Sequence, residues 1–266
     1  VRITVNGSVW DGGALAFDPA FDGLAGDTIE NVTFGQAETT TSEDGDAEKE
    51  TTLHGNYAAL RGGAIAFNSN IKENTLKNCT FRGNTALRYA GAVYYPNNYS
   101  KTSDFNPVYT VEGCTFDRNS ATYDVKNGDD AGGGAILIQV NPVSKPDTTQ
   151  WAKLYVKGST FTGNTATGFG GAISTRREAG NANAYIYINV DGSTFNGNRV
   201  TSAGNGGWRG GGGVWGGGVA PGGVFSQKFF RHNKGPICGG HFFFKHKKLP
   251  GGRMYHDGPP GGGCPR

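Results

Sequence analysis

Short hydrophobic segments, separated by glycine, asparagine and threonine, recur along residues 1–202. Each segment reads as an aliphatic residue, a polar residue, Gly or Asn, a small residue, Thr and an aromatic residue. The copies are IENVTF (29–34), LKNCTF (76–81), VEGCTF (111–116), VKGSTF (156–161) and VDGSTF (190–195), with ITVNGSVW (3–10) as a looser first copy. The same residue types recur in the same order at uneven intervals, which indicates a repeat protein.

The aromatic residue and a following asparagine define the first motif. The aromatic residues are Trp10, Phe34, Phe81, Phe116, Phe161 and Phe195. Asparagine follows the last four of these by three positions, as Asn84, Asn119, Asn164 and Asn198. We interpret LHGN (53–56) as a further copy in which Leu replaces Phe. Because asparagine carries both a donor and an acceptor, we predict a structural ladder of these side chains that satisfies buried backbone groups.

A second motif, Gly-Gly-Ala followed by an aliphatic residue, alternates with the first. Its copies are Gly12–Leu15, Gly62–Ile65, Gly133–Ile136 and Gly170–Ile173, with Ala90–Val93 as an altered copy. We predict a structural role for Gly62, Gly63, Gly133, Gly134, Gly170 and Gly171 in this motif.

Three short strands for each turn of a coil account for both motifs. The polar-Gly pair resets which side chains face inward, as glycine at positive φ allows. Strands stacked in parallel every ~4.8 Å bury Phe, Ile and Val in continuous columns. The prediction is an all-β fold, a parallel β-helix of about six rungs that is right-handed by the rule for parallel crossovers. Loops are expected at 35–52, 96–108, 123–132, 139–152 and 176–185. The competing fold, an antiparallel sandwich, does not explain identical columns at such uneven intervals.

Two outward columns and one inward column follow from this register. The first polar position of the repeat runs Glu30, Lys77, Glu112, Lys157 and Asp191, so each charge meets an opposite one across the ladder. A threonine column, Thr33, Thr80, Thr115, Thr160 and Thr194, lies beside it. We interpret these threonines as β-branched strand residues, in preference to an ice-binding face. Cys79 and Cys114 fall in one inward column, where small packed thiols are expected in preference to a strained disulfide.

Composition divides the chain near residue 203. Residues 1–202 hold 16 basic and 21 acidic residues, a net charge of −5, whereas residues 203–266 hold 9 basic residues and one acid, a net charge of +8. The second part also holds 21 of the 46 glycines and lacks both motifs. We therefore predict a repeat domain at 1–202 and a Gly-rich basic tail at 203–266 that is disordered or the product of a reading-frame error. The chain begins at Val1, so we expect a processed protein or a fragment.

Because the sequence offers no coherent catalytic or metal-binding pattern, we expect that the chain is not an enzyme. Residues 1–202 contain one histidine, His54, and neither a zinc-type Cys/His cluster nor a calcium-binding repeat. The acid pairs Asp44/Asp46 and Asp129/Asp130 fall in polar loops. We expect no catalytic, cofactor-binding or metal-binding residues, no cofactor and no nucleic-acid partner. No apolar run reaches the ~18 residues of a membrane helix, so no membrane span is expected in this stretch.

The alternating Phe-x-x-Asn and Gly-Gly-Ala-(Ile/Leu/Val) motifs resemble those of the chlamydial polymorphic outer membrane proteins. The matching pairs are Phe81/Asn84, Phe116/Asn119, Phe161/Asn164 and Phe195/Asn198, together with the Gly-Gly-Ala copies. The resemblance covers about residues 1–202. It implies the passenger of a surface-displayed autotransporter, in which these motifs are associated with adhesion to host cells.

The function expected from pattern and resemblance is a non-enzymatic surface or secreted module of adhesin type. Its partner would be a protein or glycan on a host or neighbouring cell, and its location the cell surface, or the outer membrane in a bacterium. Two alternatives stay open: a carbohydrate-active β-helix enzyme, such as a polysaccharide lyase or hydrolase, and a purely structural stalk.

Overall fold

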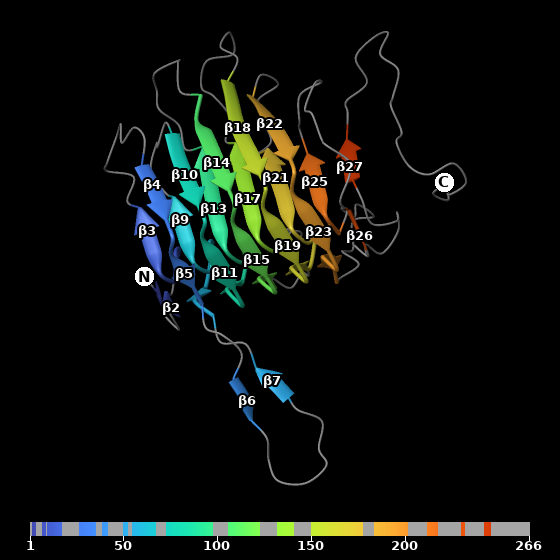
Figure 1. Cartoon of the computed structure of the whole chain (residues 1–266). Coiled ribbons are helices and arrows are strands. Elements are labelled where there is room, and N and C mark those ends of the chain that lie inside the picture. Colours follow the sequence, from blue (N-terminus) through green and yellow to red (C-terminus); the bar gives the residue numbers. More distant parts are fainter. Residues whose placement is uncertain are drawn as a thin grey trace, which may run out of the picture.

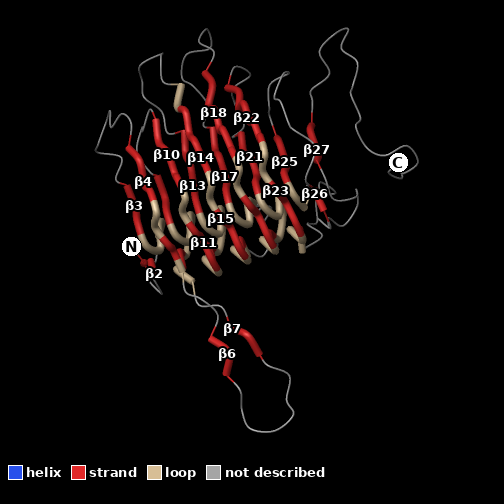
Figure 2. Tube along the Cα trace, in the orientation of Figure 1, coloured by secondary structure: helices blue, strands red, loops and turns tan. Residues whose placement is uncertain are grey.

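A computed structural model gives the architecture of the chain (Figure 1). The structure describes residues 2–3, 7–8, 10–17, 27–35, 39–41, 50–52, 55–67, 73–97, 106–122, 132–140, 150–177, 184–201, 212–217, 230–231 and 242–245. Strands and tight bends make up this part of the chain (Figure 2). Among the described residues there is no helix that could cross a membrane.

Two of the sheets carry the first motif and the segment before it. The long-strand sheet contains β4 (Asp27–Glu30), β10 (Glu73–Lys77), β14 (Val108–Glu112), β18 (Gln150–Lys157) and β22 (Ala184–Asp191). The Phe sheet contains β1 (Arg2–Ile3), β5 (Thr33–Phe34), β11 (Thr80–Arg82), β15 (Thr115–Asp117), β19 (Thr160–Thr162), β23 (Thr194–Asn196) and β26 (Phe230–Arg231).

Two further sheets follow each Phe strand along the chain. The Ala sheet contains β2 (Gly7–Ser8), β8 (Tyr57–Ala58), β12 (Thr85–Ala86), β16 (Ser120–Ala121), β20 (Thr165–Ala166) and β24 (Arg199–Val200). The GGA sheet contains β3 (Leu15–Phe17), β9 (Ile65–Phe67), β13 (Val93–Asn97), β17 (Ile136–Val140), β21 (Ile173–Arg177), β25 (Val214–Gly217) and β27 (Phe242–Lys245). A separate antiparallel hairpin pairs β6 (Thr39–Thr41) with β7 (Glu50–Thr52).

All strands of these four sheets pair in parallel, and each pairs with its counterpart in the next repeat (Figure 1). Phe81 pairs with Phe116 and Phe116 with Phe161, so the repeat columns of the sequence are columns of the structure. This confirms the parallel β-helix. Each turn, called a rung below, holds four strands, and the predicted number of three is wrong because a two-residue strand follows each motif asparagine. The right-handed sense and the number of rungs stay predictions.

The rungs bend at three columns of residues with positive φ. One column contains Asn31, Asn78, Gly113, Gly158 and Gly192, with φ between 50° and 61°. The second contains Gly35, Gly83, Arg118, Gly163 and Gly197, and the third contains Gly12, Gly62, Ala90, Gly133 and Gly170. Glycine and asparagine adopt this conformation most readily, which explains the polar-Gly pair of the repeat.

The core lies inside the coil. Inward side chains of the long-strand, Phe and GGA sheets form one cluster that includes Leu76, Val111, Phe116, Ile136 and Ile188. Five phenylalanines stack along it, with ring centroids 4.6–4.9 Å apart: Phe34, Phe81, Phe116, Phe161 and Phe195. A second stack runs from Phe17 through Phe67 and Tyr95 to Tyr109. The core is therefore a set of aromatic and aliphatic columns parallel to the coil axis.

Two assignments near the N-terminus are wrong. Ile3, not Trp10, pairs with Phe34 in the Phe sheet, and Trp10 is 70% exposed. The segment 53–56 is not a separate repeat copy either. Asn56 belongs to the same rung as Phe34, and the residues between them, which include the β6–β7 hairpin, are an insertion within the bend (Figure 1).

The repeat extends past the predicted boundary at residue 202. Strand β25 pairs with β21, which brings Val214 opposite Ile173, and Val214 is buried in the core. Gly212-Gly213-Val214 thus takes the place of Gly-Ala-Ile, a copy that the sequence analysis passed over because its alanine is replaced by glycine. Short strands β26 and β27 pair with β23 and β25. The remaining residues of 203–266 lie outside the described residues.

Candidate binding surface

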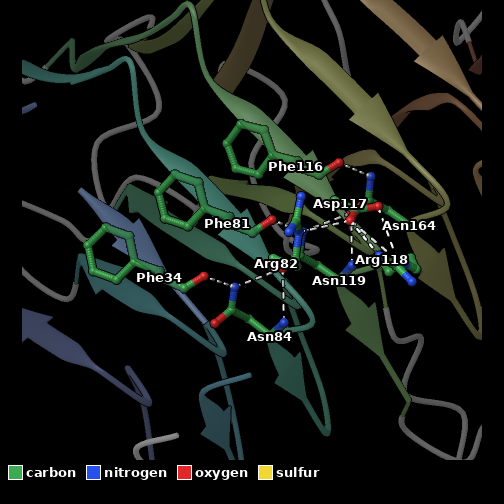
Figure 3. Close-up of polar contacts among 9 residues, drawn as sticks. All are labelled: Phe34, Phe81, Arg82, Asn84, Phe116, Asp117, Arg118, Asn119 and Asn164. Carbon is green, nitrogen blue, oxygen red and sulfur yellow. Dashed lines mark hydrogen bonds and ion pairs between the residues drawn. The ribbon is translucent and has the colours of Figure 1, made fainter. Parts of the chain in front are cut away.

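The motif asparagines form one continuous hydrogen-bonded ladder inside the coil (Figure 3). Asn84 donates both its backbone N–H and its side-chain Nδ2–H to Oδ1 of Asn119, at 3.0 and 2.9 Å. Asn119 donates in the same way to Asn164, and Asn164 to Asn198. Asn56 adds a fifth member before Asn84. Each of these amides is fully buried, so the ladder is structural.

The ladder is tied to the phenylalanine stack one rung earlier. Nδ2 of Asn84, Asn119 and Asn164 donates to the backbone carbonyls of Phe34, Phe81 and Phe116 at 3.0–3.1 Å, as Figure 3 shows, and Asn198 bonds Phe161 in the same way. Phe34, Phe81, Phe116, Phe161 and Phe195 are also fully buried. Neither the phenylalanine nor the asparagine of Phe-x-x-Asn can therefore touch a ligand in the folded chain. Any contact at this corner falls to the two residues between them.

The two glycines of Gly-Gly-Ala serve different purposes. Gly62, Gly133 and Gly170 have φ of 63°, 70° and 55° at a bend. Gly63, Gly134 and Gly171 instead lie against the backbone of the Ala sheet, and a Cβ on Gly134 would lie 2.6 Å from the N and O atoms of Thr165. The altered copy fits this division. Ala90 occupies the bend position with φ of 57°, whereas Gly91 keeps the position of closest approach.

Cys79 and Cys114 are free, buried thiols in one inward column. The Cys79 backbone N–H donates to Sγ of Cys114 at 3.4 Å, and the Cys114 N–H donates to the hydroxyl of Ser159 at 3.1 Å. The prediction of packed thiols rather than a disulfide is confirmed in this structure. The neighbouring Cys79 thiol and burial together raise the pKa of the Cys114 thiol well above its ordinary range.

Charged side chains gather outside the Phe-x-x-Asn corner. In register, Arg82 is followed by Asp117, Thr162 and Asn196 on the outer side of the Phe sheet. Nε of Arg82 lies 3.1 Å from Oδ2 of Asp117. Nη2 of Arg118 donates to the same oxygen at 3.0 Å (Figure 3). The repeat pattern does not reveal this cluster, because Arg118 lies one position after Asp117 and so in a different column from Arg82 and Asp117.

The outer face of the long-strand sheet carries the predicted charged column. Lys77 pairs in register with Glu30 and Glu112, Glu112 with Lys157, and Lys157 with Asp191. The Lys77 ammonium lies 3.3 Å from a carboxylate oxygen of Glu30. The predicted threonine column is also in register on the Phe sheet, and the hydroxyls of Thr160 and Thr194 are 3.2 Å apart. Both columns are confirmed.

An aromatic pair lies on the same outer face of the long-strand sheet. Tyr155 and Tyr187 are half-buried, with ring centroids 6.0 Å apart and a tilt of 56° between the ring planes. Their neighbours across the ladder are Thr110 and Asn189 for Tyr155, and Lys153 for Tyr187. We call Lys153, Tyr155, Tyr187 and Asn189 the tyrosine patch. The sequence analysis missed it, although Tyr155 occupies a column that holds threonine in earlier rungs, at Thr28, Thr75 and Thr110.

No three His, Cys, Asp or Glu side chains come together to hold a metal ion in the part of the chain that the structure describes. His54 and the acid pairs Asp44/Asp46 and Asp129/Asp130 fall outside the described residues.

Comparison with known proteins assigns the repeat. The model of the Chlamydia polymorphic membrane protein repeat matches residues 158–176, which run from the bend at Gly158 through Phe161 and Asn164 to strand β21. Residues 158–176 therefore carry a repeat of this family. The matched stretch contains one Phe-x-x-Asn motif and the Gly-Gly-Ala-Ile motif after it, so one polymorphic membrane protein repeat corresponds to three sides of one rung. No curated protein and no solved structure matches the chain.

Proposed function

We propose that this chain is a non-enzymatic, surface-associated module of adhesin type that binds glycans of another cell through the tyrosine patch. The family description, a membrane protein repeat of Chlamydia, supports a place at the outer membrane or cell surface. The burial of the repeat motifs supports a scaffold role for them, which leaves recognition to the outward columns.

The observation that carries this proposal is the Tyr155–Tyr187 pair. Aromatic rings beside amide, hydroxyl and ammonium groups suit a sugar, which offers an apolar face for stacking and hydroxyls for hydrogen bonds. Asn189 and Thr110 flank Tyr155 across the ladder, and Lys153 flanks Tyr187. The sheet beneath holds these side chains at fixed spacing, so the patch is organised before a ligand arrives.

Glycan-array screening of the full chain, followed by titration calorimetry with the best neutral glycan, tests the proposal. Replacing both rings, in the variant Tyr155→Ala/Tyr187→Ala, is expected to lower the affinity at least about ten-fold. The variant Tyr155→Phe/Tyr187→Phe keeps the rings and is expected to retain binding within about three-fold.

A matched control uses the same column at the other end of the sheet, in the variant Thr28→Ala/Thr75→Ala, which should bind like the unmodified chain. Binding that survives loss of both rings would contradict the assignment to the tyrosine patch. A chain that binds no glycan at all would favour the structural stalk, and turnover of a polysaccharide would favour the enzyme.

A further inference from the structure

Building on the proposed function, on which it rests, we propose that Lys153 makes the tyrosine patch selective for anionic glycans. The Lys153 ammonium group takes a carboxylate or sulfate of the sugar, while the rings of Tyr155 and Tyr187 stack on the sugar itself. The ligand class is thereby narrowed from glycans in general to glycans that carry a negative charge.

The four residues of the tyrosine patch form a two-by-two array on the outer face of the long-strand sheet. Lys153 pairs in register with Tyr187, and Tyr155 with Asn189. The two tyrosines therefore occupy one diagonal of the array, with ring centroids 6.0 Å apart, and Lys153 and Asn189 occupy the other. A strand spacing of about 4.8 Å and a rise of about 3.3 Å per residue separate the Cα atoms of Lys153 and Asn189 by about 8 Å. A sugar on the rings thus meets an ammonium group at one edge and an amide at the opposite edge.

Lys153 has no acidic neighbour across the ladder. It lies in register between Val108 and Tyr187, which are both uncharged. Among the residues that the structure describes, no carboxylate lies within ion-pair distance of the Lys153 ammonium. Glu73 lies in the same column but two strands away, about 10 Å at the usual strand spacing, which exceeds the Debye length of about 8 Å at physiological ionic strength. The charge of Lys153 is therefore available to a ligand.

Lys157 provides the contrast, on the same face of the same strand. It lies in register between Glu112 and Asp191, so its charge is balanced within the sheet. Asp191 follows Asn189 by two residues in β22. The Asn189 end of the array thus borders charges of both signs, whereas the Lys153 end carries an unbalanced positive charge. This difference orients an anionic sugar with its negative group at Lys153.

The chemistry of the array predicts how much each part of the ligand contributes. Lysine binds an anion as a point charge on a flexible stem, so it accepts the oxygens of a carboxylate or of a sulfate. Asn189 supplies a donor and an acceptor for hydroxyls, and the rings stack on any apolar sugar face. An acidic sugar therefore binds through the rings and Lys153 together, whereas its neutral counterpart binds through the rings and the amide.

Titration calorimetry of the full chain with three matched glycans tests the selectivity. The glycans are an oligogalacturonate, its carboxyl-reduced neutral form and a sulfated derivative of that neutral form. We expect at least one of the two acidic glycans to bind at least about five-fold more tightly than the neutral form. The acidic glycan with the higher affinity shows whether Lys153 takes carboxylate or sulfate. Equal affinity for all three, or tighter binding of the neutral form, would overturn the selectivity.

Three lysine variants assign the selectivity to Lys153. Lys153→Gln should weaken binding of the preferred acidic glycan at least about five-fold and change binding of the neutral form less than about two-fold. Lys153→Arg keeps the charge and should retain the preference. Lys157→Gln is the matched control and should change either affinity less than about two-fold. Equal losses in Lys153→Gln and Lys157→Gln would indicate a response to net charge alone and would overturn the assignment.

The variant Tyr155→Ala/Tyr187→Ala separates this selectivity from the proposed function. If the double variant loses the neutral glycan but the unmodified chain binds acidic and neutral forms equally, the tyrosine patch stands and the selectivity of Lys153 is overturned. If acidic binding depends on Lys153 but survives in the double variant, the anion site at Lys153 stands and the ring contacts of the proposed function are overturned. Because the neutral glycan carries no charge, its binding reports on the rings without Lys153.

Discussion

The side-chain amide of Asn119 donates a hydrogen bond to the backbone carbonyl of Phe81, 3.0 Å away and one rung earlier. The ring of Phe81 in turn stacks on the ring of Phe116. Phe116 and Asn119 belong to the same Phe-x-x-Asn motif. The two positions of Phe-x-x-Asn are therefore linked between rungs, through a hydrogen bond in one case and ring stacking in the other. A change at either position should affect two rungs.

Asn119→Ala is expected to destabilise the fold by about 3 kcal/mol or more. The substitution leaves the Asn84 N–H and the Phe81 carbonyl without their partners in a buried place, and each unsatisfied group costs about 1–3 kcal/mol. Denaturant unfolding measures the change. The exposed Asn196→Ala is the control, with an expected change within about 0.5 kcal/mol. Equal effects of the two variants would show that the ladder adds no stability.

Phe116→Ala is expected to cost about 3–5 kcal/mol of unfolding free energy, as large truncations in a core do. The ring is fully buried between Phe81 and Phe161, with centroids 4.7 Å away on both sides. Leu87→Ala is a suitable control, because Leu87 is 38% exposed. A loss below about 1 kcal/mol for Phe116→Ala would place the ring at the surface and contradict the stack.

Gly134, which lies against backbone atoms, and Gly158, which has open space around it, should respond differently to an added methyl group. Gly134→Ala places Cβ against the Gly171 carbonyl and the Thr165 backbone, where neither can move without breaking the ladder, so we expect a loss above about 4 kcal/mol. Gly158 has φ of 52° and open space around it, so Gly158→Ala should cost only about 1–2 kcal/mol. Circular dichroism melts of both variants decide this. A milder effect at Gly134 would show that the coil can widen there.

Alkaline pH should weaken the fold through Cys114. Its pKa is raised in the folded chain, so between the ordinary thiol pKa of about 8.5 and the folded value the unfolded chain binds fewer protons. The unfolding free energy should then fall as the pH rises above about 8.5. Cys114→Ser removes the titration and keeps an acceptor for the Cys79 N–H, as Ser159 and Ser193 do in their rungs. Identical pH profiles for the variant and the unmodified chain would contradict this assignment.

The columns of the fold could be predicted from the sequence because they depend on local chemistry that recurs. Inward Phe116, its Asn119 partner and the alternating charges of Lys77 and Glu112 are each fixed by position within a repeat. The two cysteines followed from the same register. Where every rung repeats the same residue types, one correct register places all of them.

Other features lacked such a signal. A strand of two residues, such as Thr85–Ala86, is too short to show a period of its own, so the fourth side of the coil went unnoticed. Trp10 was aligned with the phenylalanines because it is aromatic, whereas Ile3 is the residue whose backbone pairs with Phe34. The Arg82–Asp117–Arg118 cluster and the tyrosine patch join residues of different rungs that are not part of any motif, and only the structure brings them together.

Asn56 follows Phe34 after 21 intervening residues, where the later rungs have two, yet both residues keep their places in the stack and in the ladder. The chain leaves the coil after β5 and returns to it at β8 without a change of register on either side. The number of residues at this bend can therefore change while the strands on either side of it keep their pairing. A foreign peptide spliced between Gly83 and Asn84 should be displayed outside an intact coil, which makes this bend a natural point for grafting recognition segments onto the scaffold.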